Sequence, residues 1–283
     1  MKKNLSLIVV IFISIVSTIA FADQNLINTS RSNCVQIIVP SLNSQGSGFF
    51  IDPQHVLTCF HVVGKFDYIP KTSEYKITTG KDVFVITAGG EKIDADVITT
   101  WPKSFSKFLT PRVYNEAFPV LCDFAILKLK TKSKSQITIA PLFRGKDLPP
   151  IGSNVIFSGY PLDAPTMLTH RGMISGIAHN QLICVEASVN KGNSGGALLD
   201  DKGEIIGIID MREGGISKGL DDLRKYIDRT KKYGSVELMG VDPLAADKAM
   251  IDTLDTYIST GIGYARTIKN VTDYLDKNPN LLK

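Results

Sequence analysis

The stretch NKGNSGGALLDDKGEIIGIIDM, residues 190–211, joins a glycine-rich turn to two short apolar runs that are separated by a second polar turn. Apolar runs bounded by Gly, Asn and Asp are typical of β-strands, so this stretch predicts two strands with Ser194 just ahead of the first. Gly-Asn-Ser-Gly-Gly is also ordinary turn chemistry, because Gly and Asn tolerate a positive φ. Ser194 is therefore either a turn residue or a nucleophile. A nucleophile requires a base and an orienting group from elsewhere in the chain.

Short runs of the same kind recur from Val35 to Ile209, among them CVQIIVP, VLTCF, FAILKLK, NVIFSGYP and LICVEASV. Many short strands without alternating long helices favour an all-β barrel or sandwich over an α/β fold. The irregular residues 132–153 contain Pro141, Pro149 and Pro150, and they indicate a connector between two β lobes.

The periodicity changes after Met211. Leu220, Leu223 and Ile227 share one face of a predicted helix, and Asp242-Pro243 is a start signal for a second helix. The segment GIGYART, residues 261–267, returns to a strand pattern, and residues 268–277 predict a short closing helix. We therefore expect a helical insertion near residues 213–258 and a C-terminal helix.

The N-terminus has the layout of a secretory signal peptide. Lys2 and Lys3 precede an apolar run from Leu5 to Phe21, and Ala20-Phe21-Ala22 has the form of a cleavage site. We expect residues 1–22 to be removed and the chain to be exported, to a periplasm or to the medium, with no later membrane association. The run of about 17 residues is long for a signal peptide, so a retained membrane anchor is the competing interpretation.

Composition narrows the classes further. Loss of Lys2 and Lys3 lowers the formal charge from +4 to +2, which gives no electrostatic reason to expect nucleic acid. Cys34, Cys59, Cys122 and Cys184 permit two disulfides or four free thiols in an exported chain. None of them stands in a C-x-x-C pair, so no structural zinc site, other metal or cofactor is predicted.

A candidate base lies in GSGFFIDPQHVLTCFHVV, residues 46–63. After a turn at Asp52-Pro53, an apolar run leads to His61, whose side chain suits proton transfer near neutral pH. The alternative is a histidine buried as an ordinary core residue. His55 falls in the predicted turn, and we expect it to be exposed.

A candidate orienting group is Asp123, in VLCDFAILKLK, residues 120–130. A carboxylate inside an apolar strand is costly unless it is hydrogen-bonded, so Asp123 needs a partner. It is either a cap at the strand end or the residue that fixes the tautomer of a catalytic histidine. The order His61, Asp123, Ser194, with separations of 62 and 71 residues, is the chymotrypsin order of a catalytic triad.

These segments together resemble the trypsin-like serine endopeptidases, and within them the HtrA (Deg) branch of exported bacterial proteases. The similarity covers most of residues 35–211 and 259–277. It implies two six-stranded antiparallel β-barrels of the chymotrypsin type. Residues 23–140 would form the barrel that carries His61 and Asp123. Residues 141–283 would form the barrel that carries Ser194, interrupted by the helical insertion.

The resemblance also implies residue roles. His61 would take the proton of Ser194 while Asp123 holds the ring, and the N–H groups of Gly192 and Ser194 would bind the oxyanion. Protein or peptide substrates would meet a pocket formed by four further residues: Ser188, Ile209, Asp210 and Met211. Ser188 takes the place of the carboxylate of trypsin-type enzymes, which disfavours a basic P1 residue. Ile209 favours a small or medium apolar P1 side chain.

Several features depart from the family pattern. HtrA proteases usually continue into PDZ domains, whose substrate capture is not carried over to this chain. Residues 213–258 replace a short loop and would form a lid, an exosite, a homo-oligomer surface or a peripheral decoration. Asp210 stands where relatives place a neutral side chain, so two carboxylates would compete near the triad. A Cys59–Cys122 disulfide is a further hypothesis.

Two other functions remain open besides a protease. The fold could serve as a binding or chaperone module whose cleft is occluded by the helical insertion. An esterase of small molecules would use the same acyl-transfer chemistry.

Overall fold

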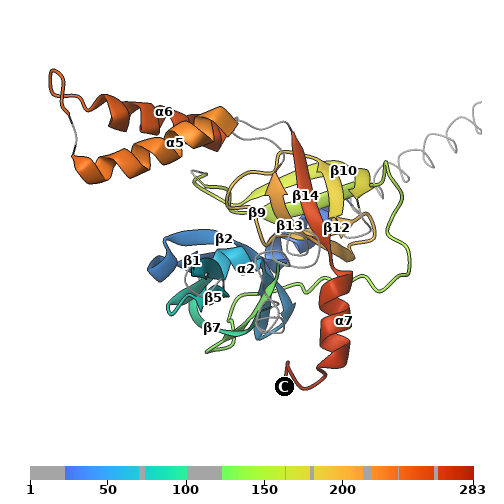
Figure 1. Ribbon diagram of the computed structural model, residues 1–283. Helices are drawn as coiled ribbons and strands as arrows, with labels where there is room; N and C mark the ends of the chain where they lie inside the picture. Colours follow the sequence, from blue (N-terminus) through green and yellow to red (C-terminus); the bar gives the residue numbers. More distant parts are fainter. Residues whose placement is uncertain are drawn as a thin grey trace, which may run out of the picture.

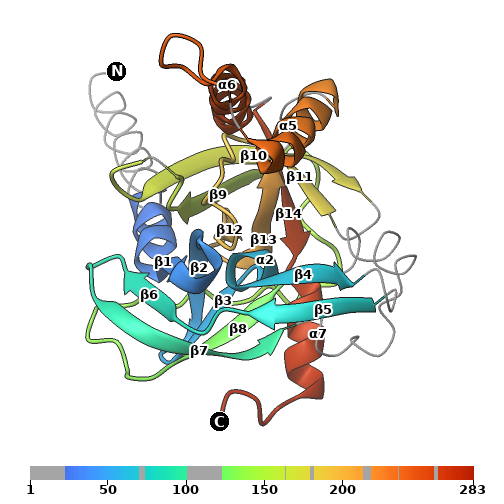
Figure 2. The same ribbon diagram turned by 60° about the vertical axis from the view of Figure 1, so that its left-hand side comes forward.

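The computed structural model describes residues 23–69, 74–100, 123–162, 164–178, 182–212, 218–234, 236–257 and 261–283. The predicted signal peptide and Cys122 lie outside these ranges. Two closed antiparallel six-stranded β-barrels lie side by side (Figures 1 and 2), which confirms the predicted fold class. Within the described ranges, no helix combines the length and the apolar character needed to cross a membrane.

The first barrel closes in the order β1-β2-β3-β8-β7-β6. Its strands follow a period of two, as in β6, where Val83, Val85 and Thr87 are buried and the residues between them are partly exposed. β4 and β5 form a separate two-stranded ribbon beside the barrel. The bounds are β1 Cys34–Val39, η1 Pro40–Leu42, β2 Ser44–Asp52, β3 His55–Thr58, α2 Phe60–Val63, β4 Gly64–Ile69, β5 Glu74–Thr79, β6 Val83–Thr87, β7 Lys92–Thr100 and β8 Ala125–Leu129.

The second barrel closes in the order β10-β11-β14-β13-β12-β9. Its core is apolar, with Phe157, Ile174 and Ile183 fully buried. The bounds are β9 Asn154–Gly159, β10 Leu168–Ala178, β11 Leu182–Glu186, β12 Ala197–Asp200, β13 Ile205–Arg212 and β14 Ile262–Thr267.

Two helices form a hairpin between β13 and β14, where the insertion was predicted. They are α5 (Lys218–Thr230) and α6 (Pro243–Tyr257), with η2 (Lys231–Tyr233) after α5. Asp242 caps α6, because its Oδ1 accepts the N–H groups of Leu244 at 3.0 Å and Ala245 at 3.2 Å. Figure 1 shows the hairpin projecting away from both barrels. Its described residues therefore do not cover the barrels as a closed lid would.

Two terminal helices tie the barrels together. Residues 23–33 are helical, which the sequence did not predict, and Ser30 Oγ lies 2.8 Å from Ser158 Oγ of β9. The predicted C-terminal helix is α7 (Lys269–Lys277). Its Tyr274 hydroxyl lies 2.8 Å from Thr99 Oγ1 of β7, and its ring meets Phe124 edge-on. Elements at both ends of the described chain thus contact the barrel to which they do not belong.

The expectation of an exposed His55 is wrong. His55 begins β3 and is 2% exposed. Its Nδ1 lies 2.7 Å from Asp52 Oδ2, and its N–H donates to Asp52 Oδ1 at 2.8 Å. The turn before β3 is therefore closed by an aspartate–histidine contact that keeps the ring inside.

Candidate active site

His61 is placed by α2, the four-residue helical turn that follows β3. Phe60, Val62 and Val63 on either side of it are buried, so the turn is fixed in the first barrel's core. The His61 side chain itself keeps 47% of its surface exposed. The ring is therefore held by buried neighbours yet faces the cleft.

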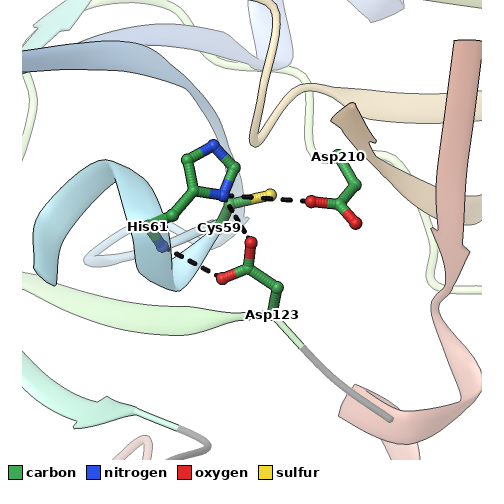
Figure 3. Close-up of side chains that lie close together, drawn as sticks. All are labelled: Cys59, His61, Asp123 and Asp210. Atoms are coloured by element: carbon green, nitrogen blue, oxygen red, sulfur yellow. Dashed lines mark hydrogen bonds and ion pairs between the residues drawn. The ribbon is translucent and has the colours of Figure 1, made fainter. Parts of the chain in front are cut away.

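Asp123 precedes β8 and holds His61 by two contacts (Figure 3). Its Oδ1 accepts the backbone N–H of His61 at 3.0 Å, and its Oδ2 pairs with His61 Nδ1. The carboxylate is 4% exposed. This pairing places a proton on Nδ1 and leaves Nε2 as the nitrogen that can accept one.

The turn that carries Ser194 depends on glycine. Gly192 and Gly195 have φ values of +95° and +92°, where side chains with a Cβ are strained. A Cβ on Gly195 would lie 2.0 Å from Ser47 O, and one on Gly192 would lie 2.3 Å from Tyr160 O. Two hydrogen bonds from Ser47 of the first barrel fix the turn: its N–H donates to Ser194 O at 2.8 Å and its Oγ to Gly192 O at 2.7 Å.

Ser194 and His61 face a common cavity of about 620 Å³, which Gly192, Lys191 and Leu162 also line. In the structure the Ser194 hydroxyl donates to the backbone carbonyl of Asp210 at 2.8 Å. Among the described residues, no hydrogen bond joins Ser194 Oγ to the His61 ring. Rotation about the Cα–Cβ bond of Ser194 would release this bond and free the hydroxyl. Loose geometry of this kind is common in resting serine hydrolases.

The two backbone N–H groups predicted to bind the oxyanion belong to Gly192 and Ser194. Asn193, between them, donates its N–H to Asn190 O at 3.0 Å. Within the described chain, the N–H groups of Gly192 and Ser194 have no protein acceptor. Two such donors on one turn beside the nucleophile can bind the oxygen of a tetrahedral intermediate.

A buried ion pair adjoins the triad. Asp210 is 3% exposed, and its Oδ2 lies 2.6 Å from Arg266 Nε on the neighbouring strand β14. Its other oxygen, Oδ1, lies 3.9 Å from His61 Nδ1. Arg266 therefore supplies a buried positive charge to a site that holds two carboxylates. The charge of Asp123 raises the pKa of Asp210, as the expected competition predicts, and Arg266 offsets part of this effect.

The pKa values follow from these positions. Burial alone would lower the pKa of His61, but the carboxylates of Asp123 and Asp210 raise it to about 9. Burial favours a high pKa for Asp123, but the His61 ring and Arg266 lower it to about 2. Burial and then the charge of Asp123 raise the pKa of Asp210 to about 7. Asp123 is thus the ionised partner of His61.

The residues predicted to line the specificity pocket do not all lie on one surface in the structure. Ser188 is exposed, just after β11. Ile209 has no exposed surface and packs in the core of the second barrel. Asp210 points at the triad (Figure 3), and the side chain of Met211 lies outside the described part of the structure.

Sequence analysis missed Cys59 and Arg266 as members of the site. Cys59 is a fully buried free thiol, and Cys122, its partner in the hypothesised bridge, lies outside the described residues. Its Sγ donates to Ile209 O at 3.3 Å, and burial followed by the charges of Asp123 and Asp210 raises its pKa well above the ordinary value. The available signals were the position of Cys59 two residues before His61 and an arginine within the strand pattern GIGYART.

A family model described as a trypsin-like peptidase domain matches residues 46–208. The chain belongs to the trypsin-like peptidase family. The match runs from β2 to β13 and includes all three triad candidates.

Several curated members of this family are similar to the chain. The Arabidopsis thaliana putative protease Do-like 14 is 30% identical over 210 residues, which are 68% of this chain and 42% of that protein. A serine protease HtrA-like protein of Staphylococcus haemolyticus is 29% identical over 57% of this chain and 25% of its own length. A probable periplasmic serine endoprotease DegP-like of Brucella suis is 28% identical over 69% and 34%. The chain spans less than half the length of each.

One solved structure is similar across nearly the whole chain. The crystal structure titled Rv3671c protease, inactive form, superposes with a TM-score of 0.53 over 91% of this chain and 94% of that one. The sequence identity of 18% supports the fold alone.

Proposed function

We propose that the chain is an exported serine endopeptidase that cleaves protein substrates through an acyl-enzyme. One observation carries the proposal: Asp123 holds His61 at the edge of the cavity that Ser194 also faces. This arrangement places a candidate nucleophile, a base and an orienting group around one cavity, which are the groups that acyl transfer needs. Family membership supports the same chemistry.

The reaction would begin with rotation of Ser194 Oγ from the Asp210 carbonyl toward His61. His61 Nε2 takes the hydroxyl proton as Oγ attacks the scissile carbonyl, and Asp123 stabilises the imidazolium. The N–H groups of Gly192 and Ser194 bind the oxyanion. His61 then protonates the leaving amine, and a water molecule activated by the same ring hydrolyses the ester to Ser194.

The specificity we propose is a small or medium apolar P1 residue. Ser188 carries no charge, so nothing at that position would attract a basic side chain. Val189, the next residue, is 1% exposed and packs on Gly263 of β14. The contact is so close that a Cβ added to Gly263 would lie 2.1 Å from Val189 Cγ2. A filled space of this kind limits the side chain that the segment can accept. A methylene more or less in such a pocket changes selectivity by only about 1–3 kcal/mol, so we expect a broad preference.

Export is the proposed location, with cleavage after Ala22. The basic start, apolar run and small residues at 20–22 support it, as does the word "periplasmic" in the names of the Brucella relatives. N-terminal sequencing of the protein recovered from the cell envelope or medium tests the cleavage site.

The helical hairpin is proposed to gate activity through the nucleophile turn. Lys191, next to Gly192, pairs with Asp255 of α6 at 2.8 Å. Displacement of α6 by a substrate or partner would release Lys191 and change the order of the turn that carries the oxyanion donors. Comparing Asp255→Asn with wild type on a small ester and on a folded protein tests this step, since gating predicts altered rates on both.

The alternative is a protease fold that serves as a binding or chaperone module. The hydrogen bond that draws Ser194 Oγ away from His61 favours it. The cavity shared by Ser194 and His61 favours the enzyme, because the cleft is not filled by the hairpin.

Fluorophosphonate labelling of the purified chain separates the two functions. A peptidase should be labelled in the wild type and not in Ser194→Ala, while the control Thr253→Ala on α6 should label as the wild type does. The binding module would be established instead by two results together. Folded wild-type protein would not be labelled, and Ser194→Ala would bind unfolded polypeptide as well as the wild type does.

A further inference from the structure

The triad region contains a set of donor atoms that the proposed hydrolysis does not use together. Cys59 Sγ, His61 Nδ1 and one oxygen each from Asp123 and Asp210 all lie within 4.8 Å of one another. Figure 3 shows the four side chains converging from the turn after β3, from α2, from the start of β8 and from β13. Catalysis needs the His61–Asp123 pair, but it assigns no role to the Cys59 thiol.

The donor set suits one class of metal. A thiolate and an imidazole with carboxylates are ligands of Zn²⁺ and related borderline cations, whereas Mg²⁺ and Ca²⁺ prefer oxygen donors alone. Tetrahedral Zn²⁺ with bonds of about 2.0–2.3 Å keeps its ligand atoms roughly 3.3–3.8 Å apart. Shifts of about 1–1.5 Å at most therefore bring the four atoms to bonding distance. The wider pairs close in, while His61 Nδ1 and Asp123 Oδ2, which are hydrogen-bonded to each other, move apart.

The surroundings support each ligand from outside. Asp210 offers Oδ1 to the cluster, because Oδ2 already pairs with Arg266 at 2.6 Å. Asp123 offers Oδ2, because Oδ1 is held by the N–H of His61. Contacts that orient ligands in this way are typical of metal sites in proteins. The half-exposed ring of His61 lines the cavity of about 620 Å³, so a cation would reach the buried cluster by passing this ring.

We propose that Cys59, His61, Asp123 and Asp210 form a Zn²⁺ site whose occupation reversibly blocks the catalytic histidine. Starting from His61 protonated on both ring nitrogens and both carboxylates ionised, binding forms four bonds to the metal and releases two protons to solvent, one from the Cys59 thiol and one from His61 Nδ1. No oxidation state changes. In the occupied site, the Cys59 thiolate and the two carboxylates carry three negative charges. Zn²⁺ and Arg266 together carry three positive charges, so the site is neutral.

Coordination explains inhibition without any obstruction of the cleft. Once Nδ1 binds the metal, His61 carries its remaining proton on Nε2 and cannot accept the proton of Ser194. Removal of the metal returns Nδ1 to Asp123. The inhibitory part of this inference rests on the proposed peptidase function, while metal binding does not.

The first experiment therefore uses Ser194→Ala, which tests binding without activity. Co²⁺ added to this chain should give one equivalent of tetrahedral cobalt with a sulfur-to-metal charge-transfer band, and Zn²⁺ should displace it. In Ser194→Ala/Cys59→Ser the band should vanish and Zn²⁺ affinity should fall by at least about a hundredfold. The matched control Ser194→Ala/Cys34→Ala removes another buried thiol, whose Sγ bonds to Ser158 O, and should bind as the parent does.

The second experiment measures labelling of the wild type by fluorophosphonate with and without Zn²⁺. Zn²⁺ should suppress labelling at least tenfold, a chelator should restore it, and Cys59→Ser should resist the metal. The absence of a sulfur–cobalt band in Ser194→Ala would overturn the site, and so would Zn²⁺ inhibition that Cys59→Ser leaves unchanged. Metal binding by Ser194→Ala together with an unlabelled wild type would retain the site and overturn the peptidase.

Discussion

The triad region and the helical hairpin both contain many charges, but they use them in opposite ways. At the triad, Asp210 and Arg266 are both almost fully buried. On the hairpin, Arg224 pairs with Asp221 and Asp255 at partly exposed positions. Burial makes each triad charge dependent on its partner, whereas solvent screens the hairpin pairs. Single changes should therefore destabilise the fold much more in the first region than in the second.

The largest expected effect is the loss of the proposed nucleophile, Ser194. Ser194→Ala should lower kcat by about 10⁶-fold, since removing a triad serine leaves only binding and oxyanion stabilisation. Its unfolding free energy should change by about 1 kcal/mol or less, because one exchangeable hydrogen bond is lost. Peptide hydrolysis and urea denaturation measure the two quantities. A similar loss in Thr253→Ala on the hairpin would contradict the contrast between the regions.

The next effect concerns the buried pair. Arg266→Met should destabilise the fold by about 3–5 kcal/mol, because it leaves Asp210 buried without its cation. Arg266→Met/Asp210→Asn should recover a large part of this loss. Urea denaturation measures both, with Arg224→Met as the control on the hairpin, where about 1 kcal/mol or less is expected. Equal losses of unfolding free energy for Arg266→Met and Arg224→Met would contradict the contrast between the buried and the exposed charges.

The pH dependence should reveal the same charges. His61 is faced by Asp123, Asp210, Arg266 and the Cys59 thiol, and its pKa is raised to about 9. The ring acts as a base only when neutral, so kcat/KM in chelator-treated protein should rise roughly fiftyfold from pH 7 to pH 9. The stability contributed by the charged ring is fully present below its unfolded pKa of about 6.5 and is lost as the pH rises through 9.

Asp210→Asn sharpens this pH prediction. It removes the carboxylate 3.9 Å from His61 Nδ1, so the rise in kcat/KM should move to lower pH. If the pH profile of kcat/KM is the same in Asp210→Asn and the wild type, Asp210 does not affect the pKa of His61.

The smallest effect belongs to the hairpin. Arg224→Gln should destabilise α5 and α6 by about 0.5–1 kcal/mol at low salt, and the difference should shrink in 1 M NaCl, where the Debye length is about 3 Å. Hydrogen exchange of α6 amides measures it, with β12 amides as the internal reference. An effect that spreads to β12 would show that the hairpin and barrel unfold as one unit.

Much of the candidate site could be identified from local sequence. His61, Asp123 and Ser194 each stand in a segment whose strand and turn signals are strong, and their order along the chain connects them. The glycine turn was also predictable, because Gly192 and Gly195 adopt a positive φ that few other residues tolerate.

The sequence is least informative where the pairing register of a strand decides which side chain faces the site. Strand β13 contains a bulge between Ile209 and Met211, so Asp210 is an extra residue opposite β14. A bulge re-aims the side chains around it, and a period-two pattern cannot reveal one. Ile209 therefore packs in the core although a place in the pocket was predicted, and Asp210 turns to the triad. Its partner Arg266 is 56 residues away across the helical insertion, a separation that no local pattern bridges.

The late position of β14 and α7 in the chain has a consequence for synthesis. β14 lies between β11 and β13 and carries Arg266, while α7 reaches back to Thr99 of the first barrel. The second barrel cannot close, and Asp210 cannot pair with Arg266, until residues 262–267 have left the ribosome. The cleft between the barrels therefore cannot assemble while β14 is still being synthesised.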